Sequence, residues 1–360
     1  VTLTGVTLLF ACAQANGTMA RAVAQALRLC RGQARWLPPA FFMLAALAAM
    51  VGPGAILSTA LIAPFAMNTG VRAGLPPFLI ALMVCNGANA GNLSPFSTTG
   101  AIASALMTRS GLGGHEFRVW IFHAAAHVLV GSAAYVLCGG IASWRRTDRL
   151  EMPDPPRLER VHVVTAAVTA AWIASVILLR WPLGWPALAA AVILLLLRAA
   201  PAREAVRRMP WKIIALVVTI STAVGALERA GGLAWFENAL ARVATPRSVH
   251  GVVAFVMGVI SAYSSTSGVV LPAFLPLAPP LAARLAGVDA LALAITIVIG
   301  SALVDVSPLS TLGALTIAAA PEGPAAGALF RKLMIWGLAM TVVGAGLCYL
   351  ASPLFRVGTR

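Results

Sequence analysis

Two short stretches of this sequence place the same oxygen-bearing side chains around a proline inside an apolar run. The first is L-S-P-F-S-T-T-G at residues 93–100, and the second is V-S-P-L-S-T-L-G at residues 306–313. Pro95 and Pro308 lack a backbone N–H, so each should interrupt a helix. In an apolar environment an interrupted helix exposes unpaired backbone groups, and such a break persists where it lines a polar site.

Each break should offer oxygen ligands to a cation. The prolines should free the backbone carbonyls of the residues four positions earlier, Gly91 and Val304. Two further oxygen-bearing side chains, Ser301 and Asp305, lie beside the second of these carbonyls. Unwound carbonyls with neighbouring hydroxyls suit a hard monovalent cation, so we predict that these four residues bind Na⁺ or H⁺.

The other polar side chains around the breaks are small and uncharged. The N-terminal ends of the resumed helices add backbone N–H groups that suit an anion. We therefore predict an anion-binding substrate site that includes Asn86, Asn89, Asn92, Ser94, Ser97, Thr98, Ser307, Ser310 and Thr311.

Asp305 is the acidic residue of the second break and occupies the position equivalent to Asn92 of the first. A carboxylate inside a membrane is costly unless it is paired or protonated, which favours a functional role. We expect Asp305 to supply charge to the coupling cation. The structural alternative is an Asp that is neutral or hydrogen bonded to Ser301 and Ser307.

A purely structural account of the two motifs is also open. Ser and Thr in membrane helices often bond back to their own chain, and Pro and Gly can simply kink a helix. One motif alone would favour that account. Two copies at matched positions favour a binding site, because each lies about 40 residues after a predicted hairpin.

The composition places most of the chain in lipid. Hydrophobic residues make up 60% of the 360 residues and charged residues 10%, and the mean hydropathy is +0.89. The net charge of +15 comes from Arg and Lys in the connections between apolar runs, without the aromatic-interleaved patch of a nucleic-acid site. The five scattered cysteines argue for neither a disulfide framework nor a metal centre. We predict an all-α polytopic membrane protein with no cofactor beyond its coupling ion.

The apolar runs differ in how they can use the membrane. They are residues 2–16, 38–68, 75–108, 116–142, 161–180, 182–199, 211–227, 249–280, 287–319 and 330–352. The runs 38–68 and 249–280 carry polar or turn-forming residues at their centres, so we predict that each forms a re-entrant hairpin. Their tips supply the remaining predicted substrate contacts, Gly52, Gly54, Ser265, Thr266 and Ser267.

The matching motifs belong to a longer internal repeat at an offset of 213 residues, which also pairs Gly87 with Gly300. Five crossings separate the two copies, so we predict inverted repeats at 1–142 and 211–360, joined by a cytoplasmic loop and two helices at 143–210. The distribution of Lys and Arg predicts that the first hairpin opens from the cytoplasm. Because two helices precede only the second copy, we also expect further helices before residue 1.

The stretches at residues 5–19 and 86–100 carry a family resemblance. G-V-T-L-L-F-A-C-A-Q-A-N-G-T-M and N-G-A-N-A-G-N-L-S-P-F-S-T-T-G are similar to the MatC-type dicarboxylate (malonate) carriers of the ion transporter superfamily. The resemblance implies a site at the membrane midplane, a homodimer of scaffold and transport domains, and cation-coupled dicarboxylate uptake by alternating access. It also implies a multi-pass protein of the bacterial cytoplasmic (inner) membrane.

The hairpin tips depart from the pattern of the wider superfamily, in which each tip bears Ser-Asn-Thr. This chain has Gly-Pro-Gly at residues 52–54 and Ser-Thr-Ser at residues 265–267. The first tip should therefore contact its ligand through backbone N–H groups. Because no Arg lies at either break, malonate, succinate and other small anions stay open as substrates.

Two other classes of protein deserve comparison. An intramembrane Ser/His enzyme would explain one serine of the second tip and one histidine, but not the internal repeat. A passive channel is disfavoured because closed hairpins imply occlusion. His123 and His127 share one helix face and could bind a metal or relay protons, but without a third ligand nearby they fit packing and interhelical hydrogen bonds better.

Overall fold

The computed structural model describes most of the chain. It covers residues 2–28, 33–52, 54–144, 157–179, 181, 184–209, 211, 215, 218, 219, 222, 223, 226, 229–285, 287–320 and 324–356. Most of the predicted span at 211–227 and of the loop after residue 144 lies outside these residues. The regular structure of the described residues is helical, with no β-strand, which confirms the all-α class.

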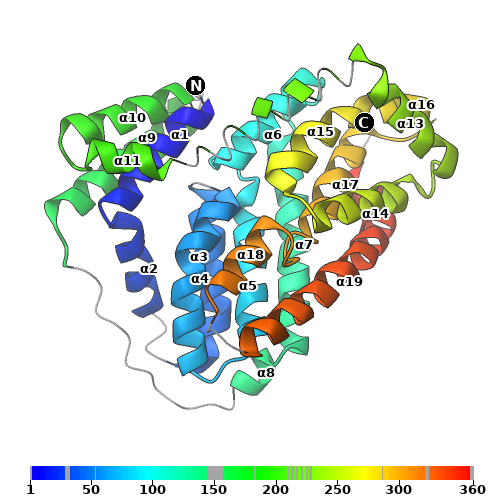
Figure 1. Ribbon diagram of the computed structural model, residues 1–360. Coiled ribbons are helices and arrows are strands. Elements are labelled where there is room, and N and C mark those ends of the chain that lie inside the picture. The colour runs from blue at the N-terminus through cyan, green and yellow to red at the C-terminus, as the bar shows by residue number, and fades with distance from the viewer. Residues whose placement is uncertain are drawn as a thin grey trace.

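The first half of the chain contains two long helices joined by a tight turn, followed by an interrupted helix (Figure 1). Its elements are α1 (Thr2–Ala15), α2 (Thr18–Arg28), η1 (Ala34–Trp36), α3 (Leu37–Met50), α4 (Gly54–Arg72), α5 (Pro77–Asn92), α6 (Thr98–Arg109), α7 (Glu116–Leu137) and α8 (Gly140–Ser143).

The rest of the described chain begins with three connecting helices and then returns to a similar order of elements. Its elements are α9 (Arg160–Leu179), α10 (Gly184–Leu196), α11 (Ala202–Arg208), α13 (Gly232–Val243), α14 (Val249–Ala262), η2 (Thr266–Val270), α15 (Leu271–Phe274), η3 (Leu275–Leu277), α16 (Ala278–Arg284), α17 (Ala290–Ala302), α18 (Thr311–Ala318) and α19 (Pro324–Phe355). Helices α17 and α18 begin 213 residues after α5 and α6, the offset of the sequence motifs.

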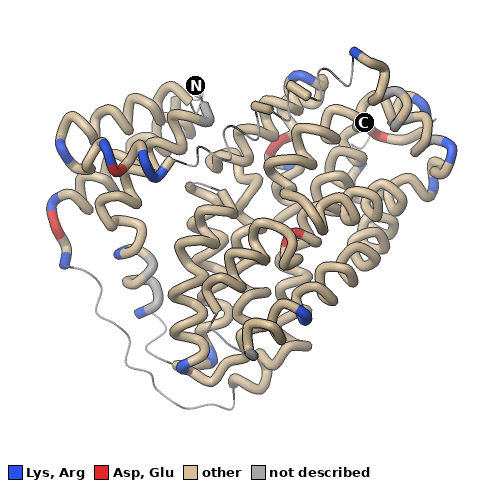
Figure 2. The backbone as a smooth tube through the Cα atoms, in the orientation of Figure 1, with Lys and Arg blue, Asp and Glu red and all other residues tan. Residues whose placement is uncertain are grey.

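The helices fit a membrane in length and composition. Within the described residues, four are long and apolar enough to cross a bilayer, namely Gly54–Arg72, Glu116–Leu137, Thr266–Arg284 and Ala325–Phe355, and six shorter apolar helices accompany them. Lys and Arg lie mainly at helix ends and in connections (Figure 2). The chain is a multi-pass membrane protein.

The helices gather into two groups. Helix α1 packs with α9, α10 and α11 around a small core of its own, at the left of Figure 1. The remaining helices form a larger body with two cores, one around α3, α4 and α5 and the other around α14, α17 and α19. Helix α2 lies between the groups and contacts both α3 and α9.

Glycines bring each interrupted helix close to the first helix of its hairpin. A Cβ atom on Gly87 of α5 would strike the backbone of Phe42 in α3, and one on Gly300 of α17 would strike Ala254 in α14. Small residues at such positions let membrane helices approach closely. The same contact therefore recurs at equivalent positions in the two halves.

Candidate substrate and cation site

The first break is a compact turn held by two serines. Helix α5 ends at Asn92 and α6 begins at Thr98. The Ser97 hydroxyl donates to the Asn92 carbonyl and accepts from the Gly100 N–H at 2.8 Å, which caps the resumed helix. The Ser97 N–H donates to the Ser94 carbonyl at 2.9 Å. Ser94 and Ser97 thus build the turn, and their hydroxyls are largely occupied by it.

The second break repeats this turn. The Ser310 hydroxyl contacts the Asp305 carbonyl, as Ser97 contacts that of Asn92. The Ser310 N–H donates to the Ser307 carbonyl at 3.0 Å. A Cβ atom on Gly313 would overlap the Ser307 carbonyl, and one on Gly100 would overlap that of Ser94 in the same way. Glycine is therefore required at this place in both turns.

The carbonyls next to the prolines are not left free. The Gly91 carbonyl accepts from the Ser94 N–H at 3.1 Å, and the Val304 carbonyl accepts from the Ser307 N–H at 2.8 Å. The sequence-based expectation that Pro95 and Pro308 free them is wrong, because the turn after each helix supplies a replacement donor. The Gly91 carbonyl also accepts from the Leu93 N–H, whereas the Val304 carbonyl keeps a second lone pair that can contact a cation.

The first hairpin tip closes over the first break. The Thr98 N–H donates to the Gly52 carbonyl at 3.2 Å, and the Ala55 N–H donates to the Asn92 side-chain oxygen at 2.8 Å. Gly54 adopts a left-handed φ of +79°. A Cβ atom built on it would lie 2.8 to 3.1 Å from three side-chain oxygens, those of Thr99, Thr98 and Asn92.

The second hairpin tip closes over both breaks. The Ser267 hydroxyl accepts from the Asn92 side-chain amide at 3.2 Å. The Thr266 backbone N–H and the Ser310 hydroxyl both interact with the Asp305 carboxylate. The Ser265 hydroxyl accepts from the Gly268 N–H at 3.2 Å and so caps the helix after the tip. Asn92 thus joins the two halves of the chain.

Two acceptors at the centre of this arrangement have no hydrogen-bond donor. They are the side-chain oxygen Oδ1 of Asn89 and Oδ1 of Asp305, which are 0% and 1% exposed as residues. The Asn89 amide nitrogen lies 3.4 Å from the Ala302 carbonyl, so Asn89 reaches from α5 to the end of α17. Buried polar atoms are normally satisfied, and acceptors left without a donor suit a bound cation or proton.

The helix ends around these atoms carry positive potential. Helices α4 and α6 begin beside Asn92, and η2 begins beside Asp305. Their backbone N–H groups favour an anion at this place. The helix starts therefore favour an anion, and each of the two unpaired oxygens can accept a cation or a proton.

Several of the predicted site residues point elsewhere. The Asn86 side chain bonds to the Leu82 carbonyl at 2.9 Å and to His127 at 3.0 Å, facing α7. The Ser301 hydroxyl donates to the Ile297 carbonyl of its own helix, and that of Ser307 donates to the Ala262 carbonyl. These two hydroxyls therefore do not donate to Asp305, which contradicts the hydrogen-bonded form of the structural alternative but not its neutral form.

One further predicted residue, Thr311, is the first residue of α18 and is half-buried. Its position resembles that of Thr98, the first residue of α6. The structure thus brings Gly54, Asn89, Asn92, Thr98, Thr266, Ser267 and Asp305 together and turns Asn86, Ser301 and Ser307 away.

Three other buried polar residues near the site, Ser58, Thr59 and Thr99, were not predicted from the sequence. The Thr99 hydroxyl is one of the three side-chain oxygens around Gly54, which we call the Gly54 cradle, together with those of Thr98 and Asn92. Ser58 and Thr59 of α4 are fully buried, and their hydroxyls have no hydrogen-bond partner. The available signal was helical spacing, because Ser58 and Thr59 lie one helical turn after the tip residues Gly54 and Ala55.

The two histidines of α7 pack against α5. His123 Nε2 lies 2.7 Å from the Asn89 carbonyl, and the two imidazole rings meet edge to face with centroids 4.7 Å apart. Within the described residues no group of three His, Cys, Asp or Glu side chains could hold a metal ion. The contacts agree with interhelical hydrogen bonding, which fixes the backbone of Asn89.

Comparison with known proteins assigns the family. The family model for citrate transporters, CitMHS, matches residues 1–300, which include the first break and both hairpins. No curated protein matches the sequence. The match confirms the predicted ion transporter superfamily, and its members are transporters and not enzymes, whereas the narrower MatC-type assignment stays a prediction. The chain belongs to the citrate transporter family and is a secondary carboxylate transporter.

Proposed function

We propose that the protein takes up a small carboxylate with two or three carboxyl groups, coupled to Na⁺ or H⁺, across the bacterial cytoplasmic membrane. The resemblance at residues 5–19 and 86–100 favours malonate or another dicarboxylate, and the family description adds citrate to the substrates. The observation that carries the proposal is the closure of the first hairpin tip over the first break and of the second tip over both breaks, with Asn92 bonded to both tips.

The anion would bind at the start of the resumed helices. Backbone N–H groups of α4 and α6 and the hydroxyls of Thr98, Thr99 and Ser267 surround the Asn92 side chain. The Ala55 and Thr98 N–H groups donate to Asn92 and Gly52 in this structure, so a bound carboxylate would replace these acceptors, without a charged clamp. A site of this kind recognises carboxyl groups and discriminates little by chain length, so several short acids should compete for it.

The cation would bind at the unpaired oxygens of Asn89 and Asp305. An amide oxygen and a carboxylate are ligands that Na⁺ accepts, and the carboxylate can instead take a proton. A cation there would also offset the cost of burying the Asp305 charge in the membrane. Substrate anion and coupling cation would then stabilise each other, which links their transport.

Transport would proceed by separating one hairpin tip at a time from the breaks. We propose that residues 1–142 and 211–360 form inverted repeats, with 143–210 between them, so that the two tips open toward opposite sides. All the central side chains are buried in this structure, as an occluded intermediate requires. Two copies of the chain would form a homodimer, and crosslinking in native membranes that yields only monomers would contradict this.

The test is uptake by the purified full-length chain in proteoliposomes. Labelled malonate, succinate and citrate would be offered with an inward Na⁺ gradient, with an inward proton gradient, and with both gradients collapsed by ionophores. We expect at least one acid to accumulate above its external concentration with one of the two gradients. Failure of all three acids to accumulate, by protein that elutes as a folded species, would overturn the proposal.

A further inference from the structure

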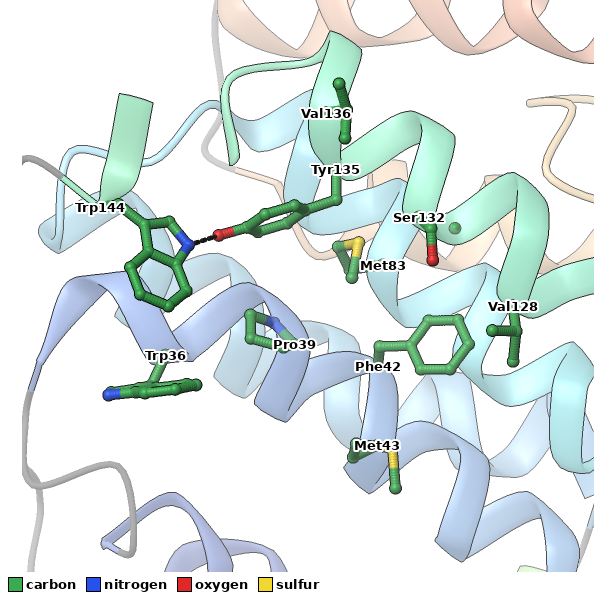
Figure 3. Close-up of a pocket in the computed structure, with 11 residues that line it drawn as sticks. Trp36, Pro39, Phe42, Met43, Met83, Val128, Ser132, Tyr135, Val136 and Trp144 are labelled. Atoms are coloured by element: carbon green, nitrogen blue, oxygen red, sulfur yellow. Dashed lines mark hydrogen bonds between the residues drawn. The ribbon is translucent and has the colours of Figure 1, made fainter. Parts of the chain in front are cut away.

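An apolar groove of about 440 Å³ runs along the outer surface between α3 and α7, away from the two breaks (Figure 3). Phe42 and Met43 of α3 form one wall, and Val128, Ser132 and Val136 of α7 form the other. The volume is that of a small-molecule site. On the surface of a membrane protein such a groove faces the acyl chains of lipids. Its length and the side chains at its ends determine whether it binds one acyl chain specifically.

One end of the groove carries the side chains that mark a membrane–water interface. Trp36 and Trp144 meet edge to face at 5.3 Å, and the Trp144 indole N–H donates to the Tyr135 hydroxyl, as Figure 3 shows. Trp and Tyr gather at the level of the lipid headgroups. This end therefore lies near the headgroups, and the groove extends from it into the hydrocarbon layer.

A cationic side chain, that of Arg35, lies at the same end. The Arg35 guanidinium lies 5.8 Å from the ring centroids of both Trp36 and Trp144. Its Nε donates to the Gln33 side chain at 3.0 Å, and no acidic side chain pairs with it among the residues that the structure describes. A guanidinium held over aromatic rings, with further N–H groups to donate, suits a phosphate oxygen.

The length of the groove matches one leaflet. From Val128 to Val136 the wall of α7 rises by eight residue steps, or about 12 Å at 1.5 Å per step. The hydrocarbon core of a bilayer is about 30 Å thick, so one leaflet is about 15 Å. An acyl chain whose headgroup lies at Arg35 would fill the groove and end near the middle of the membrane.

We propose that this groove, formed by α3 and α7 with Arg35 at its headgroup end, binds one acyl chain of an anionic phospholipid. Charge complementarity favours an anionic over a zwitterionic headgroup, and the apolar walls hold the chain. By the distribution of Lys and Arg, this end of α3 faces the cytoplasm, where anionic lipids attract basic side chains. The inference is independent of the proposed substrate.

The lipid would act on the transport machinery through Phe42. A Cβ atom on Gly131 of α7 would lie 2.8 Å from the Phe42 ring, so the floor of the groove is tightly packed. The backbone of Phe42 rests against Gly87 of α5, the helix that ends at Asn92. An acyl chain in the groove would therefore contact the hairpin helix that packs directly on the interrupted helix.

The test is to titrate the purified chain with phosphatidylglycerol or phosphatidylcholine and to measure the bound lipid by native mass spectrometry. We expect one tight phosphatidylglycerol. Arg35→Gln should raise its Kd about fivefold, the effect of one basic side chain near an anionic surface. Ser132→Phe should fill the groove and abolish the tight binding. Arg72→Gln, at the end of α4, and Ala133→Phe, exposed on α7 outside the groove wall, are the matched controls.

Three outcomes overturn the proposal. Equal binding of the two lipids would remove the role of Arg35, and an unchanged Kd in Ser132→Phe would remove the role of the groove. The third outcome is that Ser132→Phe converts a dimer to monomers while lipid binding is unchanged. The groove would then be a subunit interface and not a lipid site. Val136→Phe fills the same wall and serves if Ser132→Phe does not fold.

Discussion

The side-chain amide of Asn92 donates to the Ser267 hydroxyl at 3.2 Å, so the end of α5 is bonded to the hairpin tip of the opposite half of the chain. The same side chain accepts from the Ala55 N–H at 2.8 Å at the start of α4. One residue thus holds both tips in the closed form. An opening motion of either tip must break one of these two bonds.

Asn92→Ala should therefore impair closure on both sides. It leaves the Ala55 N–H and the Ser267 hydroxyl buried without a partner, at about 1–3 kcal/mol for each unsatisfied group. We expect a large loss of uptake together with lower thermal stability, measured in proteoliposomes and by thermal unfolding in detergent. Asn68→Ala, on the exposed face of α4, should change neither. Wild-type uptake by the Asn92 variant would show that the bridge is dispensable.

Asp305→Asn should separate coupling from movement of the substrate. The substitution keeps the size of the side chain and removes the charge that we assign to the cation. We expect concentrative uptake to be abolished or uncoupled from the ion gradient, while exchange of labelled for unlabelled substrate partly survives. Both are measured in the same proteoliposomes.

The control for this variant precedes α17, whereas Asp305 follows the last residue of that helix. Asp289 caps α17 by accepting from the Ala292 N–H at 2.8 Å, and Asn caps helices about as well as Asp. Asp289→Asn should leave coupled uptake intact. Should Asp305→Asn still accumulate substrate with unchanged ion dependence, Asp305 would not be the coupling residue.

The positions of the breaks and hairpins could be predicted from the sequence because they rest on local rules. Pro95 and Pro308 each follow the end of a helix, and the 213-residue offset locates equivalent elements in the two halves. Proline alone does not suffice, because Pro64 lies inside α4. The structure accordingly has helix ends at residues 92 and 302 and turns after residues 50 and 262.

The partners of individual side chains could not be predicted in this way. Nothing in the sequence distinguishes Asn86, which turns toward His127, from Asn89, which reaches Ala302, because both lie on one apolar helix. The choice depends on which neighbouring helix each one faces. The Gly91 and Val304 carbonyls are not free for a related reason, because the turn after each helix supplies an N–H donor in place of the one that proline lacks.

Asn89→Ala and Thr98→Ala should each raise the apparent KM for substrate or ion while the protein still inserts. Asn89 offers an unpaired oxygen at the proposed cation site, and Thr98 begins α6 beside the first tip. A hydrogen bond to a charged group contributes about 1.5–3 kcal/mol, so the change in KM should be about tenfold or more. Initial rates of uptake against substrate and Na⁺ concentration measure it. Unchanged kinetics in both variants would remove these residues from the site.

Gly54→Ala should stop transport because the first tip can no longer seat on the first break. The new methyl group would lie 2.8 Å from the Thr99 hydroxyl and 3.0 Å from that of Thr98, closer than ordinary van der Waals contact. The left-handed φ of +79° adds about 1–2 kcal/mol of strain for any residue with a Cβ atom. We expect little uptake.

Gly111→Ala separates crowding from backbone strain in this prediction. Gly111 has a φ of +74°, close to that of Gly54, but a Cβ atom there would meet nothing within 4 Å. Both variants therefore bear the same strain, and only Gly54→Ala crowds the three oxygens of the cradle. We expect Gly111→Ala to transport like the wild type. Equal losses in the two variants would show that backbone strain, and not contact between the tip and the break, accounts for the effect.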